Sequence, residues 1–146
     1  ECNGKNFKII EGVVKSGIPV MGHIGFTPQY YKKFRVQGSQ EKDWLKLINQ
    51  AKKNEEAGVF SIVVECVTSH AAKKITESLK IPTIGIGASK ECDGQILVTD
   101  DMLGLSGFYP KFVKKFVRLN NVIENSVQKY NKAVLTKKFP TKKNTF

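Results

Sequence analysis

Apolar residues recur along this chain in two patterns, as short unbroken runs and as stripes of helical spacing. Short runs rich in β-branched residues are typical of strands buried on both faces, as in a parallel sheet covered by helices. Such runs occupy residues 18–25, 60–67, 81–87 and 96–101. The stripes predict helices over residues 3–16, 41–57, 71–79 and 121–135, and a helix that starts at Pro110 and buries Phe112, Val113, Phe116 and Val117. The basic tail from Thr136 is expected to be loose.

Buried strands that alternate with amphipathic helices predict a parallel α/β architecture. With 146 residues, of which 40% are hydrophobic, a single domain with its own core is expected. Four strands are too few to close an eight-stranded barrel, even with a fifth strand cut off just before Glu1. The pattern alone leaves two architectures open, a small open sheet and the second half of a barrel.

The net charge of +11 raises the question of a nucleic-acid partner. The lysines occur singly or in pairs on the polar faces of the expected helices, and no recognised nucleic-acid motif accompanies them. We therefore expect a solvated surface that attracts anionic substrates and binds no nucleic acid. A basic polyanion-binding module remains the alternative from a different functional class.

The cellular setting is indicated by the cysteines and by the lack of long apolar runs. Three cysteines without metal-ligand spacing indicate a reduced, cytoplasmic protein. The chain contains no run long enough to cross a bilayer and no signal-peptide pattern, so no membrane association is expected. It begins with Glu1 and not with Met, which suggests that it is cut from a longer protein.

Two titratable residues stand where two of the expected strands end. Glu65 lies near the downstream end of the run 60–67, where a buried carboxylate needs a cation, a proton or several donors. His23 has the matching place at the end of the run 18–25. In a barrel the two would converge on one pocket and suit proton transfer. The alternatives are a carboxylate satisfied by a lysine or by backbone donors, and an ordinary core or loop histidine.

Three further features carry weaker signals. Gly85 and Gly87 match a phosphate loop poorly and better suit close backbone approach or tight strand packing. Asp93 and Gly94 are first of all a turn signature. The pair Asp100–Asp101 could bind a metal, although a role in capping the following turn is the more plausible interpretation.

Seven segments, in the same order, resemble motifs of the ketopantoate hydroxymethyltransferase family. The resemblance runs from Glu1 to about Lys115 and continues more weakly to the end. The segments are Gly17-Ile-Pro-Val-Met-Gly-His-Ile-Gly-Phe-Thr-Pro-Gln29, Val36-Gln-Gly38, Ile62-Val-Val-Glu-Cys66, Ile81-Pro-Thr-Ile-Gly-Ile-Gly-Ala88, Cys92-Asp-Gly-Gln-Ile-Leu-Val98, Asp101-Met-Leu-Gly104 and Pro110-Lys-Phe-Val-Lys114.

The resemblance implies a (β/α)₈ TIM barrel, of which residues 1–146 would form about the C-terminal half. It implies a transferase that adds a hydroxymethyl group from 5,10-methylenetetrahydrofolate to 3-methyl-2-oxobutanoate, giving ketopantoate on the route to pantothenate and coenzyme A. Mg²⁺ would chelate the 2-oxo acid, and the protein would form a large homo-oligomer, a decamer by resemblance. A metal-dependent lyase or mutase acting on 2-oxo acids is the rival on the same barrel.

Three residues match functional positions of the family. Glu65 matches the proton acceptor, His23 matches the active-site histidine of the Gly-His-x-Gly motif, and Glu1 matches a glutamate beside the metal. The family's other metal and substrate ligands precede Glu1, so this segment alone is expected to be inactive. Two departures concern the loops: the loop 30–34 is shorter than in the family, and Ser89 replaces a glycine.

Overall fold

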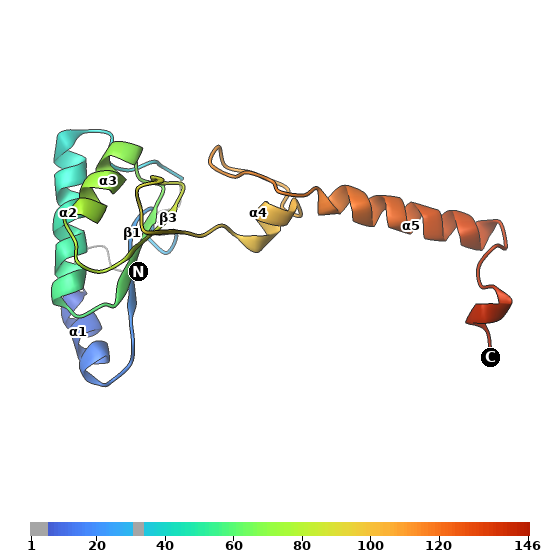
Figure 1. Cartoon of the computed structure of the whole chain (residues 1–146), viewed down its shortest axis with the longest axis horizontal. Coiled ribbons are helices and arrows are strands. Elements are labelled where there is room, and N and C mark those ends of the chain that lie inside the picture. The colour runs from blue at the N-terminus through green and yellow to red at the C-terminus, as the bar shows by residue number, and fades with distance from the viewer. Residues whose placement is uncertain (1–5, 31–33) are drawn as a thin grey trace. The chain divides into compact units, whose positions relative to one another are not determined.

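A computed structural model describes residues 6–30 and 34–146 of the chain. The chain divides into two compact units, Glu1–Ile96 and Leu97–Phe146 (Figure 1). The first unit alternates helices with parallel strands, which confirms the α/β class. The described part of the second unit contains helices and loops.

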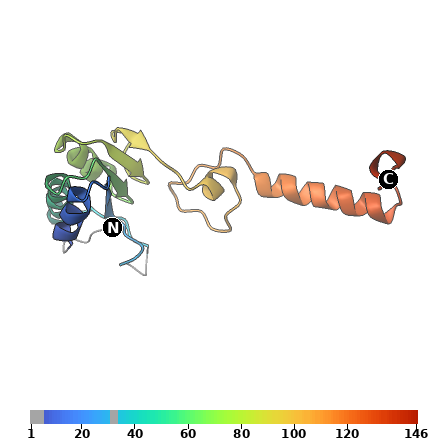
Figure 2. The same cartoon turned by 90° about the horizontal axis from the view of Figure 1, so that it is seen from below.

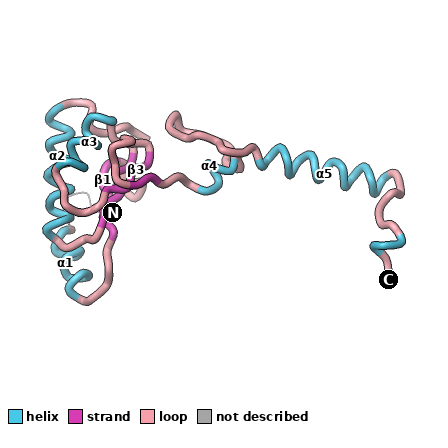
Figure 3. The backbone as a smooth tube through the Cα atoms, viewed as in Figure 1, coloured by secondary structure: helices cyan, strands magenta, loops and turns pink. Residues whose placement is uncertain are grey.

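The first unit is built on a four-stranded parallel sheet with the order β1-β2-β3-β4. Helices connect the first three strands (cyan and magenta in Figure 3), which is the connection that neighbouring parallel strands require. The strands are β1 (Met21–Gly25), β2 (Ser61–Glu65), β3 (Thr83–Ile86) and β4 (Gly94–Gln95). The helices are α1 (Phe7–Lys15), α2 (Glu41–Glu56) and α3 (Ser69–Glu77).

The two faces of this sheet have different surroundings. Figure 2 shows the helices of the first unit on one side of the strands. Ile24, Ile62 and Val64 point to that side, where they are at most 1% exposed. Since side chains alternate along a strand, His23 and Glu65 point to the opposite, half-buried face. The buried core is completed by Leu47, Ala51, Val67, Ala71, Ala72, Ile75 and Cys92.

Strands β1 and β3 begin later than their apolar runs suggest. β1 starts at Met21, and Ile18 is 55% exposed. In both runs a proline, Pro19 or Pro82, precedes the first strand residue. Proline has no N–H to donate to a neighbouring strand, so regular pairing starts only after it. Gly17, with φ +81°, follows the residue that caps the C-terminus of α1, a position where glycine commonly ends a helix.

The expected buried strand over residues 96–101 is wrong. β4 comprises only Gly94–Gln95, and residues Thr99–Leu103 form helix α4. Asp100 and Asp101 lie in the first turn of α4, where negative charge favours a helix N-terminus. The apolar side chains just before it do not become core, since Ile96 and Val98 remain half exposed.

The expected helix starting at Pro110 is also wrong, because the segment from Pro110 to Val117 forms turns and loop. The backbone N–H of Val113 donates to the carbonyl of Pro110 in a single turn. The N–H of Phe116 donates to the carbonyl of Met102, near the end of α4, and is therefore not used in a hydrogen bond of a local helix. The side chain of Phe116, predicted to be buried, is 68% exposed.

The last helix, α5 (Leu119–Leu135), confirms the expected helix over 121–135. Its apolar stripe of Ile123, Val127, Tyr130 and Val134 is exposed, with each residue at least 41% accessible. In the tail, Lys142–Asn144 form one short 3₁₀ turn capped by Thr141. None of the helices within the described ranges is long and apolar enough to cross a membrane.

Candidate active site

His23 and Glu65 meet on the face of the sheet that points away from the helices. The His23 Nε2 and Glu65 Oε2 atoms are 3.0 Å apart, and the two side chains are 20% and 19% exposed. The pairing of β1 with β2 explains the contact, because Gly25 is opposite Glu65 and His23 is two residues earlier on the same face. Glu65 ends its strand as predicted, whereas His23 is the third of five strand residues and not at the strand exit.

A carboxylate against an imidazole is an arrangement suited to proton transfer. The histidine can donate an N–H to the carboxylate, and a carboxylate held next to a substrate C–H group can act as a general base. Both groups keep some exposure, so a small molecule can reach them. The pair therefore has the chemistry and the access that a general base requires.

Gly25 allows the ends of β1 and β2 to come this close. The backbone N–H of Phe26 donates to the carbonyl of Glu65 at 2.8 Å. Gly25 has φ +92°, and a Cβ atom there would overlap the carbonyl oxygen of Glu65 and lie 2.7 Å from Cγ2 of Val67. Sequence reasoning missed this role, although the glycine closing the Gly-His-x-Gly motif was its signal.

Cys66, the residue after Glu65, was also missed. It is 1% exposed and has φ +51°, a left-handed conformation that is rare for residues other than glycine. Burial raises the pKa of its thiol to about 11, and the charge of Glu65 adds to that rise. The thiol is therefore neutral at physiological pH and does not compete with Glu65 as a base.

Asp93 has a structural role, although it connects two strands and Gly94 belongs to β4 and not to a turn. Its carboxylate Oδ2 accepts hydrogen bonds from the backbone N–H of Thr83 at 2.8 Å and from the hydroxyl of Thr83 at 3.0 Å. Gly85 is covered closely: a Cβ atom there would lie 2.9 Å from Nε2 of Gln95 and 3.2 Å from the sulfur of Cys92. Tight packing thus accounts for this glycine.

Replacing Asp93 with asparagine should reduce stability in a pH-dependent way. The hydrogen bonds from the N–H and the hydroxyl of Thr83 lower the pKa of the Asp93 carboxyl. A depressed folded-state pKa stabilises the fold above the unfolded pKa of about 4, and this contribution is lost as pH falls through the folded-state pKa. Because water screens this exposed group, the loss at neutral pH should be about 0.5–1 kcal/mol.

Urea unfolding midpoints between pH 3 and pH 7 measure this effect. The difference between parent and Asp93→Asn should be greatest above pH 5 and shrink towards pH 3. Thr83→Val, which removes the hydroxyl donor and keeps the N–H, should show a smaller loss. A constant difference across the whole pH range would contradict the assignment.

Ser89, the residue in place of the family's glycine, connects two loops at the end of the sheet. Its buried hydroxyl lies 3.1 Å from the hydroxyl of Ser69, the first residue of α3. The carbonyl of Ser89 accepts from Nε2 of Gln95 at 2.8 Å. This serine therefore helps to hold the loop after β3 against the start of α3.

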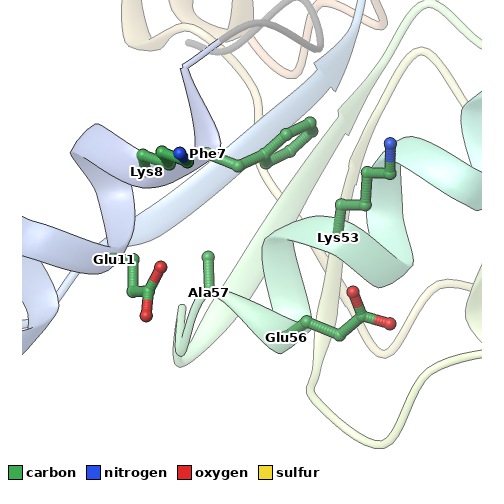
Figure 4. A pocket seen from close by; sticks show the side chains of 6 residues that line it. All are labelled: Phe7, Lys8, Glu11, Lys53, Glu56 and Ala57. Carbon is green, nitrogen blue, oxygen red and sulfur yellow. The ribbon is translucent and has the colours of Figure 1, made fainter.

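A cavity of the first unit lies away from His23 and Glu65. It has a volume of about 350 Å³ and opens between α1 and the end of α2. Figure 4 shows the side chains that line it, two basic and two acidic ones among them, with the Phe7 ring extending towards Lys53. The residues lining it are Phe7, Lys8, Glu11, Lys53, Glu56 and Ala57. Neither His23 nor Glu65 contributes to it, so this cavity is not part of the candidate site.

Two predictions fall on residues 1–5 or 31–33. Glu1, the expected residue beside the metal, lies outside the described residues, as does the centre of the shortened loop 30–34. In the part of the chain that the structure does describe, no group of three His, Cys, Asp or Glu side chains could hold a metal ion. The described residues thus bring together Glu65 and His23 alone among the predicted site residues.

Comparison with known proteins covers almost the whole chain. The family model described as ketopantoate hydroxymethyltransferase matches residues 1–142. Proteins named 3-methyl-2-oxobutanoate hydroxymethyltransferase are similar to this chain. The one from Bdellovibrio bacteriovorus is 48% identical across 97% of this chain and 55% of its own length. The corresponding protein of Clostridium botulinum (strain 657) is 54% identical across 94% of this chain and 51% of its own length.

The protein of the same name from Sulfurisphaera tokodaii is 50% identical across 92% of this chain and 51% of its own length. The chain spans about half the length of these curated relatives. The family match, the paired His23 and Glu65, and the close approach at Gly25 all concern the same strands. The chain belongs to the ketopantoate hydroxymethyltransferase family.

Proposed function

We propose that the complete protein containing this chain transfers a hydroxymethyl group from 5,10-methylenetetrahydrofolate to 3-methyl-2-oxobutanoate, giving ketopantoate for pantothenate and coenzyme A synthesis. The observation that carries the proposal is the 3.0 Å contact between His23 and Glu65, on a partly accessible sheet face and within two motifs of the family.

The proposal includes a (β/α)₈ barrel, of which this chain forms the C-terminal half. Two features support it. The four strands are parallel and neighbour one another in sequence order, as successive strands of a barrel do. The helices cover one face only, so the face carrying His23 and Glu65 corresponds to the interior of the barrel. Active sites of such barrels lie at the C-terminal ends of the strands, where Glu65 stands.

The first chemical step assigned to this chain is a proton abstraction. The carboxylate of Glu65 takes the proton from C3 of the 2-oxo acid, and the electron pair of the broken C–H bond moves into the enolate. The enolate carbon then forms a bond to the methylene carbon of the folate while one C–N bond of that carbon breaks, and its electron pair goes to the nitrogen. Water displaces the second nitrogen from the same carbon, which leaves the hydroxymethyl group on ketopantoate. The proton held by Glu65 and one proton of that water go to the two nitrogens, and tetrahydrofolate is released. His23, at hydrogen-bond distance from Glu65, holds the carboxylate and the substrate oxygens in place through its N–H groups.

Mg²⁺ is part of the proposal by resemblance, and it supplies positive charge that favours the enolate. The described residues do not form a metal site by themselves, since no cluster of three ligands occurs among them. Glu1 is the one expected contributor from this chain, and further ligands would come from the preceding part of the protein. No step above depends on the position of the metal.

The test uses the complete enzyme with its two proposed substrates. Hydrogen exchange at C3 of 3-methyl-2-oxobutanoate should occur with the 2-oxo acid and Mg²⁺ present, and ketopantoate should form once methylenetetrahydrofolate is added. Products of carbon–carbon cleavage or rearrangement would instead identify a lyase or mutase. Absence of both exchange and product would overturn the proposal.

We propose the same assembly as for the family, a homo-oligomer in the cytoplasm, with a decamer as the specific expectation. The apolar stripe of α5, which is exposed in this chain, is compatible with such contacts. Sedimentation of the complete protein measures its size. A monomer at micromolar concentration would contradict this part of the proposal without affecting the chemistry.

His23→Asn should weaken both substrate binding and catalysis while leaving measurable C3 exchange. The imidazole contacts Glu65 at 3.0 Å but is not the group assigned to take the proton. Loss of the polar contact that orients the carboxylate predicts about a tenfold effect. The measurement is the rate of C3 exchange against substrate concentration. Complete loss of exchange with unchanged affinity would assign the base to His23 instead.

A further inference from the structure

Cys66 adopts a backbone conformation that its position in the fold does not by itself require. Two non-glycine residues among those described have positive φ angles, Cys66 at +51° and Lys137 at +55°. Lys137 follows Thr136, the residue that ends α5, where a left-handed residue is common. Cys66 follows a buried strand, and no helix end accounts for its conformation. Strained residues of this kind concentrate where function requires a particular geometry.

Hydrogen bonds from three different segments hold Cys66 and its neighbour in place. The carbonyl of Glu65 accepts from the N–H of Phe26 at 2.8 Å. The N–H of Cys66 donates to the carbonyl of Ile86 at 2.9 Å, and its carbonyl accepts from the N–H of Gln37 at 2.8 Å. With its thiol 1% exposed, the residue has no room to relax. The conformation is thus imposed by the loop after β1 and by the neighbouring strand.

The left-handed residue changes which way the next side chain points. In a continuous strand, residues 65 and 67 would share a face, so Val67 would stand beside the Glu65 carboxylate. Instead, Val67 is 1% exposed and packs in the helix-side core with Ile24 and Val64. Glu65 remains on the opposite face against His23. The turn at Cys66 therefore places the side chains of Glu65 and Val67 on opposite faces of the sheet.

We propose that Cys66 is a positioning residue, whose left-handed backbone ends the strand directly after Glu65, turns Val67 away and aims the carboxylate at His23 and the substrate. The inference rests on the proposed function, since it assumes that Glu65 is the base. The backbone conformation carries this role, and the thiol has no chemical part in it. Residues that allow the left-handed conformation should preserve activity, and residues that oppose it should not.

Substitutions at Cys66 in the complete enzyme test this distinction. Cys66→Gly and Cys66→Ala remove the thiol, and glycine adopts the left-handed conformation freely. Cys66→Val introduces a β-branched side chain that strongly disfavours it. We expect the glycine and alanine variants to keep C3 exchange within about threefold of the parent. The valine variant should lose about tenfold or more in kcat with little change in KM, because a small displacement of a catalytic group has a large effect on rate.

The pH profile of C3 exchange separates positioning from a purely structural role. A reoriented Glu65 in Cys66→Val should shift the profile, whereas simple loss of stability would lower the amount of active protein and leave the profile in place. Lys137→Val is the matched control, with the same change at the other left-handed residue. It should reduce thermal stability without changing the rate per folded enzyme or the pH profile.

A second pair of variants covers the case in which Cys66→Val does not fold. Gln37→Pro removes the N–H that donates to the carbonyl of Cys66, and Gln37→Ala keeps it. The proline variant should lose at least about threefold in kcat relative to the alanine variant. Equal rates in this pair would overturn the proposal, as would a folded Cys66→Val with the parent rate and profile.

Two other outcomes have distinct meanings. If Cys66→Gly and Cys66→Ala both lose as much as Cys66→Val, the thiol matters and the backbone proposal is wrong. If Glu65→Gln keeps the parent exchange rate, the proposed function fails first. If Glu65→Gln loses C3 exchange and Cys66→Val keeps the parent exchange rate, the positioning role of Cys66 is wrong and the proposed function stands.

Discussion

Glu65→Gln in the complete enzyme is expected to fold, to bind the 2-oxo acid and to lose about 10²–10⁴-fold in the rate of C3 hydrogen exchange, the usual range for removal of a general base. Glutamine has nearly the same shape as glutamate, so the packing at the end of β2 is kept. It has no site that can accept the C3 proton at neutral pH. The carboxylate that it replaces faces His23 at 3.0 Å and is 19% exposed, so the loss concerns an accessible group.

The measurement is solvent hydrogen exchange at C3, followed by NMR without folate, so that proton abstraction is observed apart from carbon–carbon bond formation. Glu56→Gln is a suitable control, because this exposed glutamate at the end of α2 lines the separate cavity near α1. It should leave the exchange rate unchanged. A well-folded Glu65→Gln enzyme with the parent exchange rate would rule out Glu65 as the base.

Gly25→Ala should reduce both stability and activity, through a backbone clash and not through lost chemistry. The new methyl group would overlap the carbonyl oxygen of Glu65, and φ +92° is strained for alanine. Overpacking of this kind costs roughly 1–3 kcal/mol. The ends of β1 and β2 must separate to relieve it, which moves His23 and Glu65 relative to each other. A displacement of about 1 Å at such a site can cost about 10²-fold in rate.

Gly12→Ala provides the matched control. Gly12 lies inside α1, and a Cβ atom there would meet nothing within 4 Å. Alanine in a helix interior is about 0.5–1 kcal/mol more favourable than glycine, so this variant should be neutral or slightly more stable, with the parent exchange rate. Thermal unfolding and C3 exchange measure both effects. A Gly25→Ala enzyme as stable and active as Gly12→Ala would show that the close approach is not needed.

The sequence predicted the first unit well because its local and its global signals agree. The runs around Ile24, Val64 and Ile86 are apolar and β-branched, and each becomes a strand with a buried face. Glu65 could be recognised because an ionisable residue stands out at the end of such a run. The matching places of His23 and Glu65 at the ends of two runs predicted that the two would converge in a barrel. Their direct contact depends on the register of two strands 40 residues apart, which the apolar pattern does not show.

The second unit was predicted less well because local pattern and long-range contacts disagree there. The run Ile96-Leu-Val98 is as apolar as a strand, but its contact with β3 is one hydrogen bond, from the N–H of Ile96 to the carbonyl of Gly85. The paired residues end at Gln95, and Asp100 and Asp101 favour a helix start. After Pro110, the N–H of Phe116 donates to Met102, a contact that no periodicity reveals. Gly25 and Cys66 escaped notice for a related reason, since their importance lies in backbone angles and not in side-chain type.

The spacing of the paired strands also has a consequence for how the site is assembled during folding. β2 pairs with β3 across a sequence separation of 21 residues, from Ile62 to Thr83, whereas β1 pairs with β2 across 40, from Met21 to Ser61. Loop-closure entropy rises by about 0.6 kcal/mol for each doubling of length, so the pairing of β1 with β2 is the more costly one to close. Glu65 thus belongs to the βαβ unit with the shorter connection, β2-α3-β3. His23 reaches Glu65 through the pairing of β1 with β2, which has the longer connection. Local opening at β1 would separate the two groups while β2, α3 and β3 stay together.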